Sequence, residues 1–78
     1  MPRYRFHLFN DVQTQDLVGR IFPDVGAAQV DAIRSARALM CEDMTGKGEI
    51  NLSHWIELED DDGEVTVVPF RDAVTIRS

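Results

Sequence analysis

Cysteine, basic residues and long apolar runs are all scarce in this sequence. A single cysteine among 78 residues cannot form an intramolecular disulfide, which argues against a disulfide-stapled secreted domain. The eight Lys and Arg are outnumbered by 14 Asp and Glu, so a polybasic tail is not expected. No apolar run is long enough to span a bilayer, and the first residues lack the apolar core of a signal peptide. We therefore expect a cytoplasmic protein without a membrane segment.

Size and composition predict one small folded domain over residues 1–78. Hydrophobic residues make up 44% of the chain, enough for one core and too many for a disordered chain. The net charge of −6 comes from the last third, where residues 49–78 hold eight acids and two bases. Six of these acids lie between Glu57 and Glu64, so the charge marks one corner of the molecule.

The N-terminal part predicts an irregular β-hairpin. Residues 3–9 alternate between two faces and include aromatic side chains, which is typical of a strand. Residues 17–22 predict a second, shorter strand, weakened by a glycine at its centre. We place Ile21 on its core face and Arg20 on the opposite face.

The central part predicts one long amphipathic helix over residues 24–45. Asp24 can cap its N-terminus, because a carboxylate there accepts hydrogen bonds from free backbone N–H groups. Gly46 is the expected left-handed residue at its C-terminal end. Its apolar stripe has small residues along its centre, so the helix can approach a sheet closely. The stripe comprises Val25, Ala28, Ala32, Ile33, Ala36, Leu39, Met40 and Met44.

The C-terminal part predicts a second hairpin, with strands over residues 54–60 and 64–70. Asp62-Gly63 is a strong signal for a two-residue turn. That turn pairs Leu58 with Val67 and directs Val67 toward the core. A three-residue turn would move one strand to the other face, and the sequence leaves this register open.

These elements predict an α+β fold in the order β-β-α-β-β. One helix can cover only one face of a four-stranded, mainly antiparallel sheet, so the expected architecture is a two-layer sandwich. The predicted core comprises Tyr4, Phe6, Leu8, Ile21, Ala28, Ala32, Ile33, Ala36, Leu39, Met40, Ile56, Leu58, Val65 and Val67.

The uncovered face of the predicted sheet is too apolar for an ordinary solvated surface. A chain this small with no disulfide often gains stability by association, so we expect a homodimer through this face. Pairing of sheet edges is another route to a dimer, and a C-terminal segment over residues 71–78 could instead fold back over the face. The expected interface comprises Phe9, Val18, Phe22, Trp55, Val68 and Phe70.

Nucleic-acid binding is the alternative function for the same face. A basic, aromatic sheet surface is how several small modules stack bases. Glu57 and Glu59 project from the same predicted face and would repel phosphates. The candidate contacts are Arg3, Arg5, His7 and Arg20.

The sequence offers no convincing catalytic or metal-binding motif. His7, Cys41 and His54 do not stand at metal-ligand spacing, and the acidic turn does not fit an EF-hand loop. Ser53 and His54 are neighbours but lack a third, orienting group. We expect no cofactor, no metal and no enzymatic activity.

The sequence resembles a family of short alphaproteobacterial proteins that is known as a domain of unknown function. The resemblance is carried by Pro-Arg-Tyr-Arg-Phe-His-Leu at residues 2–8, Phe-Pro-Asp at residues 22–24 and Val-Pro-Phe-Arg-Asp-Ala at residues 68–73. It implies a free-standing bacterial protein and no activity. The resulting hypothesis is a non-catalytic interaction or assembly module, in a class that includes regulatory proteins, with a protein partner not identified by the sequence.

Overall fold

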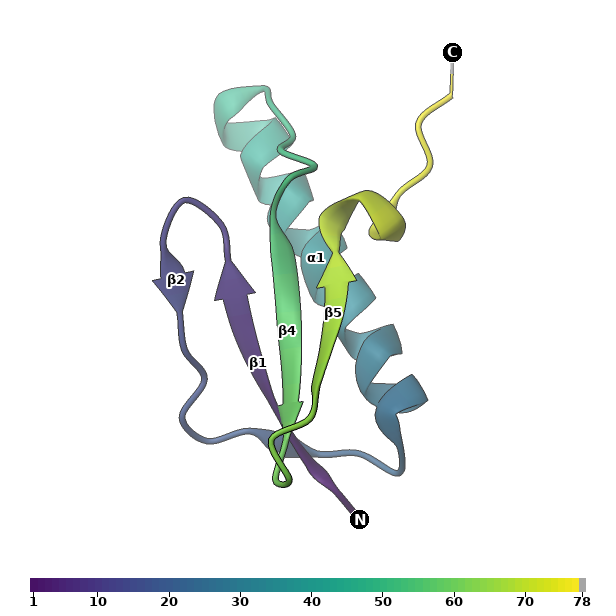
Figure 1. The fold of residues 1–78 in the computed structure, drawn as a ribbon. Coiled ribbons are helices and arrows are strands. Elements are labelled where there is room, and N and C mark those ends of the chain that lie inside the picture. Colours follow the sequence, from purple (N-terminus) through teal and green to yellow (C-terminus); the bar gives the residue numbers. More distant parts are fainter. Residues whose placement is uncertain (78) are drawn as a thin grey trace.

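The computed structural model describes residues 1–77, and in it one long helix packs on one face of an antiparallel sheet (Figure 1). The α+β fold class and the two-layer arrangement are confirmed. The sheet order is β2-β1-β4-β5, and β3 pairs with the same edge of β1 as β2. The elements are β1 (Arg3–Phe9), β2 (Gln13–Thr14), β3 (Arg20–Ile21), α1 (Val25–Lys47), β4 (Trp55–Asp60), β5 (Val65–Pro69) and the 3-10 helix η1 (Phe70–Ala73).

Helix α1 begins as the sequence predicts and ends later. The carboxylate of Asp24 accepts a hydrogen bond of 2.8 Å from the backbone N–H of Ala27, so Asp24 is the N-cap. The prediction that Gly46 ends the helix is wrong, because Gly46 lies within it. Gly48 has φ +70° and donates to the carbonyl of Met44 at 3.0 Å, which satisfies one of the free carbonyls at the helix end.

Only Arg20–Ile21 (β3) of the strand predicted over residues 17–22 is a strand, and β2 lies before that range, so the sheet has five strands rather than four. Between β2 and β3 the chain leaves the extended conformation, and Gly19 has φ +76°. The register pairs Arg3 with Ile21 and Tyr4 with Arg20. Ile21 therefore lies on the face away from the helix and is 58% exposed, so its predicted place in the core is wrong.

The β4–β5 hairpin has the three-residue turn, which reverses the faces of β5. Glu57 pairs with Val67 and Leu58 with Thr66, one position away from the two-residue register. Gly63 has φ +85°, as expected for the last residue of a type I turn with a following bulge. Val67 is consequently exposed instead of buried, and Val68 is only 5% exposed.

The core lies between α1 and the sheet, and η1 closes one end. Alanines of α1 make the close approach that the sequence predicts, because all three central alanines are fully buried. Val65 and Val67 are wrong as core predictions, whereas Val68 and two residues of η1 belong to the core. The buried apolar residues are Tyr4, Ala28, Ala32, Ala36, Met40, Ile56, Leu58, Val68, Phe70 and Ala73.

The segment after β5 packs on the helix and not on the uncovered face of the sheet. Nε of Arg37 on α1 donates to the carbonyl of Ala73 at 2.7 Å, and Val74 packs against the core. The expectation that residues 71–78 could cover the open face is therefore wrong for residues 71–74. Ser78, the last residue of that predicted segment and of the predicted domain, lies outside the described residues.

Candidate functional site

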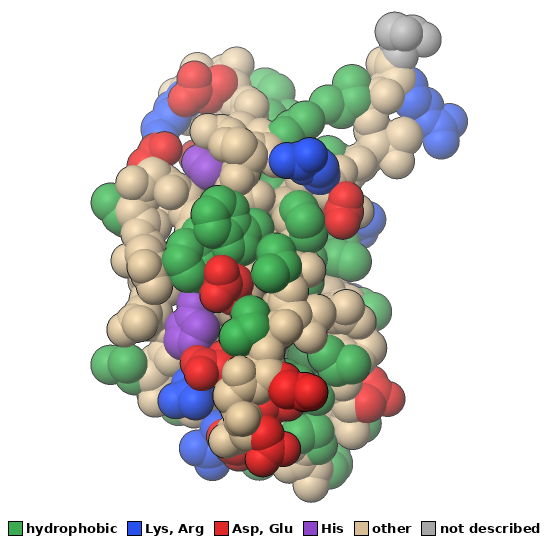
Figure 2. Space-filling model, in the orientation of Figure 1, with side chains coloured by type: hydrophobic (Ala, Val, Ile, Leu, Met, Phe, Trp, Pro, Cys, Tyr) green, Lys and Arg blue, Asp and Glu red, His purple; other side chains and the backbone are tan. Residues whose placement is uncertain are grey.

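No helix or further strand of the described chain covers the face of the sheet turned away from α1, and only the loop between β2 and β3 lies against its β1 side. Figure 2 looks onto this face and shows hydrophobic side chains gathered over its middle, with acidic side chains toward the β4–β5 turn. The strand registers assign its side chains. They are Arg3, Arg5, His7 and Phe9 of β1, Trp55, Glu57 and Glu59 of β4, and Val65, Val67 and Pro69 of β5.

Two stacked aromatic rings form the centre of the hydrophobic group. Phe9 and Trp55 are direct cross-strand partners, and their rings lie 4.9 Å apart between centroids and nearly parallel, at 5°. Nε1 of the indole donates to Glu57 at 3.0 Å, which fixes the ring on the sheet. Trp55 also pairs with Pro69 on its other side, and Val67 lies beside them. We call Phe9, Trp55, Val67 and Pro69 the aromatic patch.

A shallow depression of about 430 Å³ adjoins the aromatic patch. Trp55, Val67 and Pro69 form its apolar side. Arg71 and Asp72, at the start of η1, add one charge of each sign. The depression offers an apolar surface with a polar rim, which is the usual composition of a protein-binding site.

The structure brings together two of the six residues predicted for the interface. Phe9 and Trp55 lie in the aromatic patch. Val18 is 75% exposed in the loop between β2 and β3. The predicted open-face position is wrong for Phe22, which packs against Tyr4 and Phe6 with centroid distances of 6.3 Å and 5.6 Å. It is also wrong for two residues that the corrected register buries, Val68 and Phe70.

Val67 and Pro69 are open-face residues that were not predicted as such, although the residues of the turn before β5 carry a signal for this placement. Asp at the first position and Gly at the fourth are the favoured residues of a type I turn. Asp60 and Gly63 hold these positions, and the Asp60 carboxylate accepts hydrogen bonds of 2.9 Å from the backbone N–H groups of Asp62 and Glu64. The four-residue Asp60–Gly63 turn therefore predicts the observed register, which the Asp62-Gly63 pair alone does not.

The candidate nucleic-acid contacts do not form one basic surface. His7 lies 2.8 Å from Glu59 through Nε2, and Arg5 lies 3.8 Å from the same carboxylate. The prediction that Arg20 shares this face is wrong. The β1–β3 register turns Arg20 to the helix side, where it pairs with Asp31 of α1 and lies over the ring of Phe6 at 4.8 Å. Arg3 remains on the open face and is exposed.

His7 and Glu59 form a fixed pair on the open face. The backbone N–H of Asp16 donates to Nδ1 of His7 at 3.2 Å, so the ring hydrogen is placed on Nε2 and is donated to Glu59. The hydrogen bond from His7 lowers the pKa of Glu59, desolvation opposes it, and the charge of Arg5 adds to the lowering. The hydrogen bonds of His7 hold β1 to β4 and to the neighbouring loop, whereas the buried Nε of Arg5 has no hydrogen-bond partner.

Asp16 replaces a missing strand at the β1 edge of the sheet. Its carboxylate accepts a hydrogen bond of 3.1 Å from the N–H of Phe6, at the point of β1 between the sections paired with β2 and β3. It also accepts bonds of 3.0 Å from Val18 and Gly19 in its own loop. Desolvation raises the pKa of Asp16, but the three backbone donors and the nearby His7 outweigh it and hold the pKa below its ordinary value.

The other chemically notable residues lie apart from one another. Cys41 is exposed on α1, whereas His54 is buried with its ring edge-on to Phe70 at 5.6 Å. The hydroxyl of Ser53 donates to Asn51 rather than to His54. Across residues 1–77, no three His, Cys, Asp or Glu side chains are grouped so that they could hold a metal ion. The same residues contain no helix with the length and hydropathy needed to cross a membrane.

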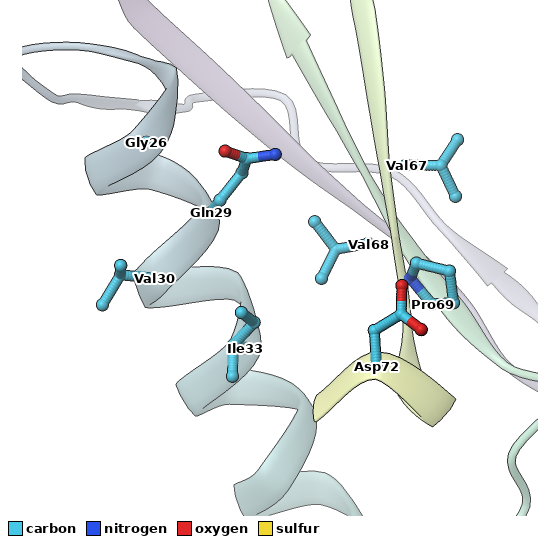
Figure 3. Close-up of a pocket in the computed structure, with 8 residues that line it drawn as sticks. All are labelled: Gly26, Gln29, Val30, Ile33, Val67, Val68, Pro69 and Asp72. Atoms are coloured by element: carbon cyan, nitrogen blue, oxygen red, sulfur yellow. The ribbon is translucent and has the colours of Figure 1, made fainter. Parts of the chain in front are cut away.

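A groove of about 340 Å³ runs between α1 and β5 (Figure 3). Val30 and Ile33 line it from the helix and Val68 from the strand, while Asp72 stands at its η1 end. Val30 is 57% exposed, so this side of the helix is apolar and uncovered. The groove lies directly beneath the outer edge of β5.

The outer edge of β5 presents free backbone groups. Phe70 donates to the carbonyl of His54 at 2.9 Å and Asp60 to that of Glu64 at 3.0 Å, so these pairs are hydrogen-bonded. Hydrogen-bonding residues alternate along an antiparallel ladder. The N–H and C=O groups of Val65 and Val67 therefore point away from β4. Pro69 points the same way and has no N–H to leave unpaired.

The comparisons with known proteins identify a domain of unknown function and give no activity. No curated protein and no solved structure matches the chain. One family model matches residues 3–71, which include every strand and the whole of α1. The chain therefore belongs to the family described as a domain of unknown function, DUF6894.

Proposed function

We propose that this protein is a non-catalytic protein-interaction module that binds its partner through the open face of the sheet. The observation that carries the proposal is the Phe9–Trp55 stack on a face that no helix or further strand of residues 1–77 covers. Aromatic side chains supply much of the binding energy in protein interfaces, because they bury a large area at a low cost in conformational entropy. Their partner-facing surface is bordered by Arg71 and Asp72, which can orient a bound chain.

The charged groups of the open face support a binding role over a catalytic one. The carboxylate of Glu59 is engaged by His7, and that of Glu57 by the indole of Trp55. A general acid or base must exchange a proton with its substrate, and both ring nitrogens of His7 are already engaged, by Glu59 and by the backbone N–H of Asp16. Here the carboxylates position their neighbours, and the apolar surface between them is left for contact.

Nucleic-acid binding loses its structural argument. It required Arg3, Arg5, His7 and Arg20 on one face. Arg20 lies on the other side of the sheet, and Glu59 lies against both His7 and Arg5. A surface whose basic side chains are paired with its own acidic side chains attracts phosphates weakly.

We place the protein in the bacterial cytoplasm, a setting that its single exposed cysteine supports.

A photo-crosslinking experiment in the cells of origin tests the proposal. Benzoylphenylalanine in place of Trp55 keeps an aromatic side chain in the patch, and the same group in place of Arg34 samples the exposed side of α1. We expect a discrete protein adduct from position 55 only, and its loss when Phe9→Glu is added. Adducts to nucleic acid, equal adducts from both positions or none from position 55 would contradict the proposal.

A further inference from the structure

We propose that β5 is a self-pairing strand, so that two copies of this chain join β5 to β5 into one continuous antiparallel sheet. The inference rests on the proposed role as an interaction module and names a second copy of the chain as one partner. It uses the edge of the sheet, not the open face. A chain of this size has a small core, and association is a common means of stabilising such folds.

The free backbone groups limit this contact to two antiparallel registers. Val65 and Val67 each offer one N–H and one C=O on the outer edge, and Pro69 offers only a C=O. Placing Val65 opposite Val67 of the second copy lets every free N–H find a carbonyl across a two-fold axis at Thr66. The neighbouring register, with Val65 opposite Pro69, forms the same number of hydrogen bonds but places a proline ring without an N–H against the Val65 carbonyl inside the ladder. In the Val65–Val67 register the carbonyl left over is that of Pro69, which lies outside the paired residues.

The side chains on both faces of the strand suit the same register. On the open face, Val65 and Val67 are 51% and 52% exposed and would meet each other across the axis. On the helix face, Thr66 would meet Thr66 of the second copy, a favourable cross-strand pair. The groove beneath, with Val30 and Ile33, would be covered by the added strand.

The turn before β5 is acidic, and the residues after β5 include an arginine beside Asp72, which favours a second copy over an unrelated strand. Exposed Asp61 and Asp62 form the turn before β5, and exposed Arg71 follows it. In an antiparallel pair the beginning of one strand lies beside the end of the other. Each copy therefore places its acidic turn near Arg71 of its mate, and the two-fold axis makes this contact twice.

A proline substitution in β5, followed by size-exclusion chromatography with light scattering, tests the pairing. The wild-type protein is expected to show twice the mass of one chain. Val67→Pro removes an outward N–H that the internal ladder does not use, so a folded monomer is expected. Val67→Thr keeps that N–H and is the matched control, expected to remain dimeric. A wild-type monomer at all concentrations, or a dimer that survives Val67→Pro, overturns the proposal.

A charge exchange tests the contact without any backbone change. Because each substitution acts on two symmetric contacts, Arg71→Glu is expected to raise the dimer dissociation constant about tenfold, as is Asp61→Arg with Asp62→Arg. Combining all three substitutions is expected to restore the affinity. If the triple variant has a dissociation constant as high as that of Arg71→Glu alone, the antiparallel arrangement is wrong.

The outcomes separate this inference from the proposed function. A monomer that still gives a protein adduct from position 55 contradicts self-pairing and leaves open-face binding intact. A β5-dependent dimer without such an adduct supports self-pairing and contradicts partner binding by the aromatic patch.

Discussion

On one side the sheet ends in β2 and β3, two strands of two residues each, and on the other it ends in β5, a strand of five. The short edge is closed by side chains, because Asp16 takes the backbone N–H of Phe6 that no strand reaches. Within residues 1–77, no side chain is hydrogen-bonded to the outer edge of β5 between Val65 and Val67. Short edge strands and inward-pointing charges protect a sheet from adding further strands. This fold therefore protects one edge of the sheet and leaves the other available for pairing.

Removing the closing carboxylate is expected to have the largest effect on stability. Asp16→Ala leaves the N–H groups of Phe6, Val18 and Gly19 without their acceptor, and an unsatisfied, partly buried donor is costly. We expect a loss of about 2–3 kcal/mol in the free energy of unfolding, measured with urea at neutral pH. Asp16→Asn keeps an acceptor oxygen and should cost less. A loss below about 0.5 kcal/mol for Asp16→Ala, the range of ordinary surface substitutions, would show that the carboxylate does not close this edge.

Two adjacent valines test the register that leaves the β5 edge free. Val68 is 5% exposed and Val67 is 52% exposed. Val68→Ala is expected to lower the free energy of unfolding by about 2 kcal/mol, whereas Val67→Ala should cost under about 0.5 kcal/mol in the monomer. Urea unfolding of both variants at low protein concentration makes the comparison. A larger loss for Val67→Ala than for Val68→Ala would contradict the observed register and favour the two-residue turn, in which Val67 is buried and Val68 is exposed.

Two glycines test how tightly each edge is built. Both have positive φ, +76° for Gly19 and +85° for Gly63. A Cβ on Gly19 would meet the backbone carbonyl of Tyr4 and the side chain of Arg3 at 3.0 Å, whereas one on Gly63 would meet no atom within 4 Å. Gly63→Ala is expected to cost about 1 kcal/mol from backbone strain, and Gly19→Ala more. Equal melting temperatures for the two variants would contradict the close contact at Gly19.

Acid should weaken the closed edge selectively. The pKa of Asp16 is lowered in the folded protein, so its stabilising effect is complete above the unfolded value of about 3.9 and is lost as the pH falls through the folded value. The lowered pKa of Glu59 acts in the same direction. We expect stability to decline below about pH 4, with a shallower decline in Asp16→Asn. Denaturant titrations at several pH values measure both slopes, and parallel slopes would exclude Asp16 as a contributor.

The elements with local signals could be predicted from the sequence. The alternation of β1, the N-cap Asp24 and the alanine stripe of α1 each point to one structure, and each is confirmed. The faces of β5 could not be predicted from alternation, because apolar residues occupy both faces of this strand, Val65 and Val67 on one and Val68 on the other. Only the geometry of the Asp60–Gly63 turn separates the two registers.

The closed edge could not be predicted because it depends on contacts between distant residues. Asp16 was one polar residue in a polar run, and nothing local connects it to Phe6. Gly19 is a weak point in the predicted strand, and its left-handed conformation delays the start of the strand to Arg20 and brings the loop against β1. The helix-side position of Arg20 follows from the same change in conformation.

Amide hydrogen exchange followed by NMR at two protein concentrations tests the central claim most directly. The N–H of Phe6, held by Asp16 within each chain, should be protected equally at both concentrations. The N–H groups of Val65 and Val67 should exchange rapidly when dilute and become protected when concentrated, as the β5 edges pair. Rapid exchange of Val65 and Val67 at both concentrations, or protection that does not depend on concentration, would contradict an edge that is open in the monomer and closed by a second copy.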